Sequence, residues 1–355
     1  MNPANLIPVA DTLTAPNGWF QFFLMLTFPL HLFAMNAMLG AGLVAFISHL
    51  YPGRAYRELS HELAKVLPFL VAFTVNLGVA PLLFVNVIYG HLLYSSTVLM
   101  GLFWLAVIPL LIIAYYLAYI YDFRFKRLGN LAMFVLLTVL VLLLTIGFIF
   151  SNNMSMMISP VSWSRWFATP GGTLLNLVDP TLWPRYLHII TGALAVGGLF
   201  SALYATTILK SDPEVAEAGR KLGMQLFSWL TLLQLGIGTW FLLTLPKTTM
   251  YRFMGGGPIA TALLIAGILL AVATLISGFK RLVLPAFWLI LVLVYVMSFM
   301  RDVVRGNFLA PYFNPVTVPV QVQWTPLIFF LTTLVLGGGV VIWMLVKLKN
   351  AKKAC

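Results

Sequence analysis

The sequence predicts an all-α integral membrane protein with about nine transmembrane helices, in a single membrane domain over residues 1–355. Its composition is the first observation: 61% of the residues are hydrophobic and only 8% are charged, and the mean hydropathy is +0.99. About a quarter of the residues in a soluble domain are charged. The second observation is that uninterrupted apolar runs of about twenty residues recur, which is the length of a membrane-spanning helix and twice that of a barrel strand.

The apolar runs are bounded by charged residues and by proline or glycine, which marks the ends of the predicted helices. Taken in chain order, the predicted spans cover residues 19–50, 65–94, 98–121, 129–151, 183–209, 222–245, 258–278, 282–300 and 325–347. The charged residues lie between these runs, so we expect none of them to be buried in hydrocarbon.

The basic residues that separate the spans fall unevenly on the two sides of the membrane. Fifteen of the 21 lie on one side, where they follow the odd-numbered spans. They are Arg54, Arg57, Lys65, Arg124, Lys126, Arg127, Lys210, Arg220, Lys221, Lys280, Arg281, Lys347, Lys349, Lys352 and Lys353. Because cytoplasmic loops carry the excess of Lys and Arg, we expect the N-terminus outside and the C-terminus in the cytoplasm.

The other side receives the six remaining basic residues and the two longest loops, residues 152–182 and 301–324. The six are Arg165, Arg185, Lys247, Arg252, Arg301 and Arg305. The two loops are poor in charge and rich in Pro, Trp, Phe and Tyr, a composition that suits burial against a partner. We therefore predict that the outer face is the functional interface. The alternative is that these loops only cap the bundle within the lipid interface.

Charge and cysteine content exclude several classes of function. The net charge of +12 does not indicate nucleic-acid binding, because the basic residues are scattered among short loops without a basic stripe. The single cysteine, Cys355, excludes a disulfide framework, a thiolate metal cluster and covalent haem attachment through a CxxCH motif. Residues 1–18 lack the basic start and short apolar core of a signal peptide, so we expect the first helix to direct insertion.

Histidine is the residue type that could carry chemistry inside this bundle. His31, His91 and His188 all fall within predicted helices, towards the outer half of the membrane. Neutral imidazole is the usual axial ligand of haem iron. The alternative for each is a histidine that is hydrogen-bonded to a neighbouring carbonyl. His49 and His61 lie near the inner side, where we expect them to be solvated.

Neighbours of two histidines fit a cofactor site. Small residues follow His188 at helical spacing, at Thr191, Gly192 and Ala195, and would let a flat macrocycle approach, although small residues also permit close helix packing. Met35, one turn after His31, could line or ligate a cofactor, but methionine at helical spacing also fills cores. Arg185, one turn before His188, could pair with a haem propionate, steady a quinone head group or anchor a lipid phosphate.

These segments resemble subunit I of the cytochrome bd quinol oxidases, a nine-helix fold whose N-terminus is outside. The run GWFQFFLMLTFPLHLF is similar to the opening helix of that family, and WPRYLHIITGALAVGGLF to the helix that supplies the histidine of the low-spin b haem. The resemblance implies that His31 and His188 are haem ligands. Weaker similarities are NLGVAPLLFVNVIYGHLLYSS, FIFSNNMSMMISPVSW, LPKTTMYRFMGG and RDVVRGNFLAPYFNPVTVPVQ.

The sequence also departs from that family. The membrane glutamates that ligate haem and deliver protons are missing, the quinol-binding loop shrinks to residues 246–257, and the methionine ligand of the low-spin haem has no counterpart. His91 is the most economical replacement for that methionine. Because dioxygen reduction consumes protons at a buried site, we expect this chain not to be an oxygen reductase.

The predicted function is therefore a b-haem subunit, with one or two haems, of a quinol-linked respiratory complex in the prokaryotic inner membrane. Its expected contacts are membrane lipid, quinone or quinol as substrate, and an outer-face redox subunit such as a multihaem cytochrome c or an iron–sulfur protein. Two alternatives remain. One is a haemless membrane anchor that binds quinone or scaffolds an assembly, and the other is a small-molecule transporter.

Overall fold

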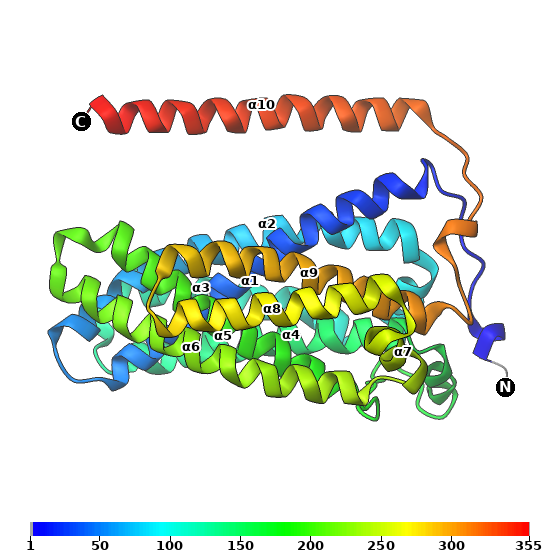
Figure 1. Ribbon diagram of the computed structural model, residues 1–355, viewed down its shortest axis with the longest axis horizontal. Coiled ribbons are helices and arrows are strands. Elements are labelled where there is room, and N and C mark those ends of the chain that lie inside the picture. Colours follow the sequence, from blue (N-terminus) through cyan, green and yellow to red (C-terminus); the bar gives the residue numbers. More distant parts are fainter. Residues whose placement is uncertain (1–2, 355) are drawn as a thin grey trace.

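The computed structural model describes residues 3–354, and these residues form a bundle of long helices without a strand (Figure 1). Nine of the described helices are long and apolar enough to cross a membrane. They are α1 (Asn17–Leu50), α2 (Arg54–Leu99), α3 (Gly101–Leu128), α4 (Leu131–Met157), α5 (Leu182–Thr207), α6 (Pro213–Thr244), α8 (Pro258–Phe279), α9 (Val283–Leu309) and α10 (Trp324–Ala354). The predicted all-α membrane fold is confirmed.

Each predicted span lies mostly within one of these helices, but several helices extend beyond the apolar run. The largest differences are at the start of α2, at the start of α6 and at the end of α9, which continues from Met300 to Leu309. A span predicted from hydropathy ends at the first charged residue. The helix itself continues beyond that residue, because its backbone hydrogen bonds continue. At 46 residues α2 is about 69 Å long, more than twice the hydrocarbon thickness, so its polar end projects from the membrane.

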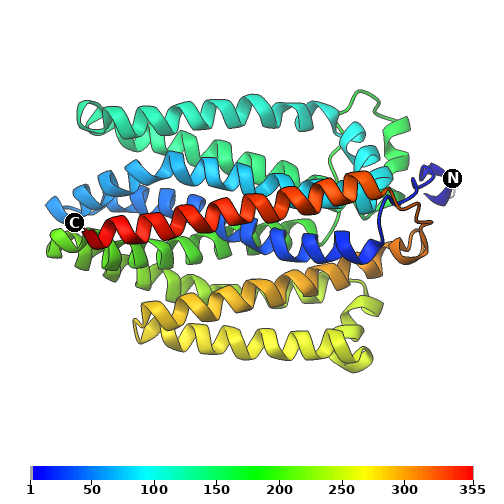
Figure 2. The ribbon, with the colours of Figure 1, turned by 90° about the horizontal axis from the view of Figure 1, so that it is seen from above.

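Glycine contacts hold the centre of the bundle together. Gly40 of α1 meets Gly197 of α5 backbone to backbone, and Gly198 of α5 meets Gly223 of α6 in the same way. A Cβ on Gly198 would lie 2.6 Å from the carbonyl oxygen of Gly223, a distance that no side chain tolerates. Small residues at such positions let membrane helices approach closely. The central layer therefore consists of α1, α5 and α6, with α3 and α4 to one side and α8 and α9 to the other (Figure 2).

The last helix, α10, runs beside the bundle and is exposed along its described side chains. Its ring contacts are made by Phe330, whose centroid lies 5.4 Å from that of Phe23. The chain enters α10 through an extended segment that pairs with the N-terminal segment, where the amide of Leu13 donates to the carbonyl of Pro319 at 2.9 Å. The described chain begins and ends at opposite ends of the bundle (Figure 1), as an odd number of crossings requires.

The loop predicted over residues 301–324 is wrong for its first nine residues, which belong to α9. Arg305 lies inside α9 and is only 3% exposed, and Arg301 and Asp302 precede it within the same helix. The sequence pattern placed these residues in a loop because the apolar run ends at Met300. The helix instead continues for nine residues and carries the charges into contact with α1 and α2.

Candidate functional site

His188 lies near the start of α5 and faces α6. A Cβ on Gly238 would be 3.4 Å from its Cε1 and 3.7 Å from its Nδ1, so the absence of a side chain at Gly238 accommodates the ring. Gln234, one turn earlier in α6, donates from Nε2 to the carbonyl oxygen of His188 at 2.7 Å. The Nδ1 of His188 and the Oε1 of Gln234 are both buried without a hydrogen-bond partner among the described residues. Both residues that carry an unsatisfied polar atom thus belong to the α5–α6 interface.

His31 lies in α1 and faces α2. Its Nδ1 is 3.0 Å from the carbonyl oxygen of Thr74. Gly78, one turn further along α2, leaves space for the ring, because a Cβ there would lie 2.8 Å from Cε1 of His31. Metal-ligating histidines commonly direct one ring nitrogen at a backbone carbonyl, which fixes the ring and leaves the other nitrogen for the metal. The ring of His31 has the same arrangement, because its Nδ1 is directed at the backbone carbonyl of Thr74.

His31 and His188 lie at one depth but point apart. Each precedes the contact between Gly40 and Gly197 by nine residues, about 13 Å along helices that run in the same direction. Nine residues also correspond to half a turn of rotation beyond two full turns. Both rings therefore point away from the α1–α5 contact, His31 towards α2 and His188 towards α6. The two imidazoles belong to two separate places in the bundle.

His91 lies in the C-terminal part of α2, beyond a kink. Tyr89 has non-helical torsion angles there, with φ −121° and ψ 24°. The His91 ring packs edge-on against Phe313, from the loop after α9, at 4.5 Å between centroids. No hydrogen bond or ring contact joins two of the three candidate histidines within residues 3–354. His31 contacts α2, His188 contacts α6, and His91 contacts the loop after α9.

Met35 and the small-residue face of α5 take part in helix packing. Met35 is partly buried against the core cluster that α1 to α6 form together. Thr191 and Ala195 are buried, and a Cβ on Gly192 would lie 2.8 Å from Nε2 of Gln234. The face formed by Thr191, Gly192 and Ala195 thus includes a close approach to α6 at Gly192.

Arg185 is tied to the outer loop that precedes α5. Its NH2 group donates to Oγ1 of Thr181 at 2.7 Å, and Thr181 in turn donates from Oγ1 to Asp179 at 2.8 Å. Ser155, at the end of α4, also donates to Asp179. The guanidinium Cζ lies 5.7 Å from the ring centroid of Phe241 in α6. Arg185 therefore lies between the loop that precedes α5 and helix α6, one turn before His188.

Sequence reasoning missed a charged group on α9. Gln21 of α1 donates from Nε2 to Asp302 at 2.6 Å, and Arg305 forms an ion pair with the same carboxylate. Arg301 places its Cζ 4.4 Å from the ring centroid of Phe28, which is one turn before His31. The available signal was the spacing of Arg301 and Arg305, which puts both on one helix face. Arg301 thus lies at the level of α1 one turn before His31.

The two histidines expected to be solvated, His49 and His61, both lie within helices. His61 lies within α2, and its ring stacks on Phe125 at 4.6 Å between centroids. His49 stacks on Phe125 at 5.4 Å, and its Nε2 is buried. Aromatic packing across α1, α2 and α3 accounts for both positions.

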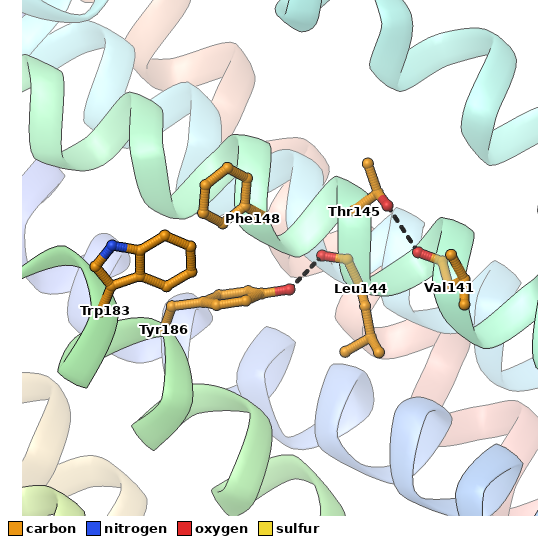
Figure 3. A pocket seen from close by; sticks show the side chains of 6 residues that line it. All are labelled: Val141, Leu144, Thr145, Phe148, Trp183 and Tyr186. Atoms are coloured by element: carbon orange, nitrogen blue, oxygen red, sulfur yellow. Dashed lines mark hydrogen bonds between the residues drawn. The ribbon is translucent and has the colours of Figure 1, made fainter. Parts of the chain in front are cut away.

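An open groove of about 320 Å³ lies between α4 and α5 (Figure 3). Its walls include Phe148, Trp183 and Tyr186. The hydroxyl of Tyr186 donates to the carbonyl of Leu144 at 2.7 Å. Tyr186 precedes His188 by two residues, about 200° around the helix, so the groove opens on the opposite side of α5 from His188.

Comparison with family models and with curated proteins finds no match to this sequence.

Proposed function

We propose that this chain is the membrane b-haem subunit of a quinol-linked respiratory electron-transfer complex. It resides in the prokaryotic inner membrane and exchanges electrons between the quinone pool and a redox subunit on the outer face. The observation that carries the proposal is the pair His31 and His188. These two imidazoles lie at one depth in the membrane, and each faces a glycine of a neighbouring helix.

The donor chemistry at these positions fits haem b. Imidazole nitrogen is the usual protein ligand of its iron, and His188 has a buried ring nitrogen without a partner. Thr74 holds the ring of His31 in the way that a carbonyl orients a metal ligand. When bound, haem b supplies reversible one-electron transfer. His188 and His31 would each hold one haem, because their rings point apart, and His91 is the further proposed ligand.

Arg185 is the proposed partner of a haem propionate or a quinone head group. It lies one turn outward of His188 and uses one N–H group for Thr181. A guanidinium has five N–H donors, so most of its capacity is available for an anionic or carbonyl oxygen. Met35 is the proposed wall of the site at His31, one turn towards the inner side.

The proposed redox partner, a multihaem cytochrome c or an iron–sulfur protein, docks on the outer face. Side chains of the two outer loops leave apolar surface exposed there, at Val161, Phe167, Val178 and Val316, each more than half exposed. The described residues outside the long helices form short helical turns and loops. Electrons that arrive at this face therefore leave through another subunit.

We propose further that the protein does not reduce dioxygen. Asp302 is a carboxylate that the structure places within α9 where the sequence predicted a loop, and both of its oxygens are occupied, by Gln21 and by Arg305. A carboxylate held as a counter-ion in this way is not free to deliver protons. The expected role is electron transfer alone.

A difference spectrum tests the proposal. The purified protein, reduced with dithionite, should give a b-type signal, and pyridine haemochrome should give one or two haems per chain. His188→Ala should remove the low-spin signal while the protein still inserts, whereas His61→Gln, at the inner end, should leave it unchanged. Wild-type protein without Soret absorbance would contradict the proposal and favour a haemless anchor that binds quinone or scaffolds an assembly.

A further inference from the structure

Two arginines on one face of α9 lie against rings of two other helices. Arg301 and Arg305 are four residues apart, so their side chains are neighbours. The Cζ of Arg301 lies 4.4 Å from the ring centroid of Phe28 in α1. The Cζ of Arg305 lies 4.6 Å from the ring centroid of Tyr89, at the kink of α2. The pair therefore occupies the junction of α1, α2 and α9 at the outer end of the bundle.

Most of the hydrogen-bonding capacity of these two guanidinium groups is unused. Each has five N–H donors. Arg305 donates to Asp302 from NH2, but its Nε and NH1 are buried without a partner among the described residues, and the residue is 3% exposed. Arg301 forms no hydrogen bond or ion pair with any residue that the structure describes. A buried charged donor without an acceptor is costly.

The charge of this region is also unbalanced. Asp302 is the carboxylate in ion-pair contact with Arg305. Arg301 interacts electrostatically with Arg305 and with Arg185 of α5, both of like charge, and also with the Asp302 carboxylate that Arg305 already pairs with. Two positive charges on α9 thus face one negative charge, with a third positive charge nearby. Repulsion between like charges in a region of low dielectric requires a counter-anion.

We propose that Arg301 and Arg305 form a binding site for an oxyanion, the carboxylate or phosphate group of an amphiphilic ligand. Planar guanidinium groups match both oxyanions with paired hydrogen bonds. Such a group has two possible sources at this depth: the propionates of haem, which rest on the proposed function, or the phosphate of an anionic phospholipid, which does not.

Arg301→Gln is the cleanest variant for testing this site, because Arg301 forms no hydrogen bond or ion pair with the described residues and loses its contact with the Phe28 ring alone. Arg305→Lys keeps the charge beside Asp302 and hence the fold, but cannot donate in the paired geometry. Arg252→Gln is the matched control, since Arg252 is an exposed basic residue between α6 and α8, on the same side of the bundle. Each protein is purified from membranes, its haem is quantified by pyridine haemochrome, and its bound phospholipid is measured by native mass spectrometry.

Arg301→Gln and Arg305→Lys should retain about a tenth or less of the ligand that wild type and Arg252→Gln hold, since one charge-assisted hydrogen bond corresponds to about tenfold in affinity or more. Loss of haem identifies propionate as the oxyanion, and loss of an anionic phospholipid with haem retained identifies lipid phosphate. Unchanged contents in both variants, or a wild type that holds neither ligand, would overturn the site. Wild type with bound lipid but no haem would refute the proposed function and leave the site standing.

Discussion

Gly40 of α1 and Gly197 of α5 pack against each other without a side chain between their backbones. A Cβ on Gly197 would lie 2.9 Å from the amide nitrogen of Gly40 and closer still to its Cα. This contact fixes the spacing of the two helices that carry His31 and His188. It therefore links the stability of the bundle to the geometry of the candidate site.

Gly197→Ala should destabilise the protein, because the added methyl group forces α1 and α5 apart. Overpacking of this kind costs about 1–3 kcal/mol, which should lower the midpoint of thermal unfolding in detergent by several degrees. Gly236→Ala is the control, since a Cβ at Gly236 meets nothing within 4 Å. Equal midpoints for the two variants would show that the glycine contact does not limit helix approach.

Gly78→Ala should displace the ring of His31 without removing it. The new Cβ would lie 2.8 Å from Cε1 and 2.9 Å from Nδ1 of His31, so the ring must turn and its contact with Thr74 must lengthen. If His31 holds a haem, the absorption band and the midpoint potential of that haem should shift. Gly90→Ala, in the same helix, meets only Asn86 at 3.8 Å and should leave both unchanged. A spectrum unaltered by Gly78→Ala, beside one altered by His31→Ala, would disprove this coupling.

Gln234→Leu should weaken the α5–α6 interface at His188. The substitution leaves the His188 carbonyl without its side-chain donor, at a cost of about 1 kcal/mol. It also removes the side chain that is hydrogen-bonded to the backbone of His188, so a haem held by His188 should shift in midpoint potential while that held by His31 should not. Thr239→Val serves as control, because the Thr239 hydroxyl bonds only within its own helix. A potential that shifts equally in both variants would argue against a local role for Gln234.

The architecture was predictable because long apolar helices leave a strong pattern in the sequence. The ends of the helices were not, since α9 continues beyond Met300 with charged residues that hydropathy assigns to a loop. The burial of Arg305 depends on Gln21 and Tyr89, which lie more than two hundred residues away in the chain. A local sequence pattern cannot predict a contact between residues so far apart in the chain.

The candidate site was predictable only in part. Position in the apolar runs placed His31 and His188 at similar depth, and the structure gives each a glycine to face. The partners Thr74, Gln234 and Gly238 come from neighbouring helices whose rotation about their axes depends on packing. His91 was expected to complete a ligand pair, yet its recorded ring contact is with Phe313. Which faces of neighbouring helices meet depends on how the whole bundle packs, and a local sequence pattern does not determine it.

The native Cys355 offers a direct test of the predicted orientation. The positive-inside rule places the C-terminus in the cytoplasm, because fifteen of the 21 basic residues lie on that side. A membrane-impermeant maleimide should therefore label Cys355 in inverted vesicles and spare it in intact cells. Ser164→Cys in a Cys355→Ser background should show the opposite pattern, since Ser164 is exposed in the outer loop. Labelling of Cys355 in intact cells would reverse the assigned topology.

Cross-linking tests the outer face as the docking surface for the redox partner. The apolar side chains exposed at that face, among them Val161 and Phe167, suit burial against another protein. In the Cys355→Ser background, Ser164→Cys should form adducts with a haem- or iron–sulfur-containing subunit in native membranes. Ser211→Cys is the matched control, because Ser211 is equally exposed but lies in the connection between α5 and α6 at the opposite end. Adducts to a redox subunit from Ser211→Cys alone would place electron exit on the inner side, and they would overturn both the docking surface and the direction in which electrons leave the protein.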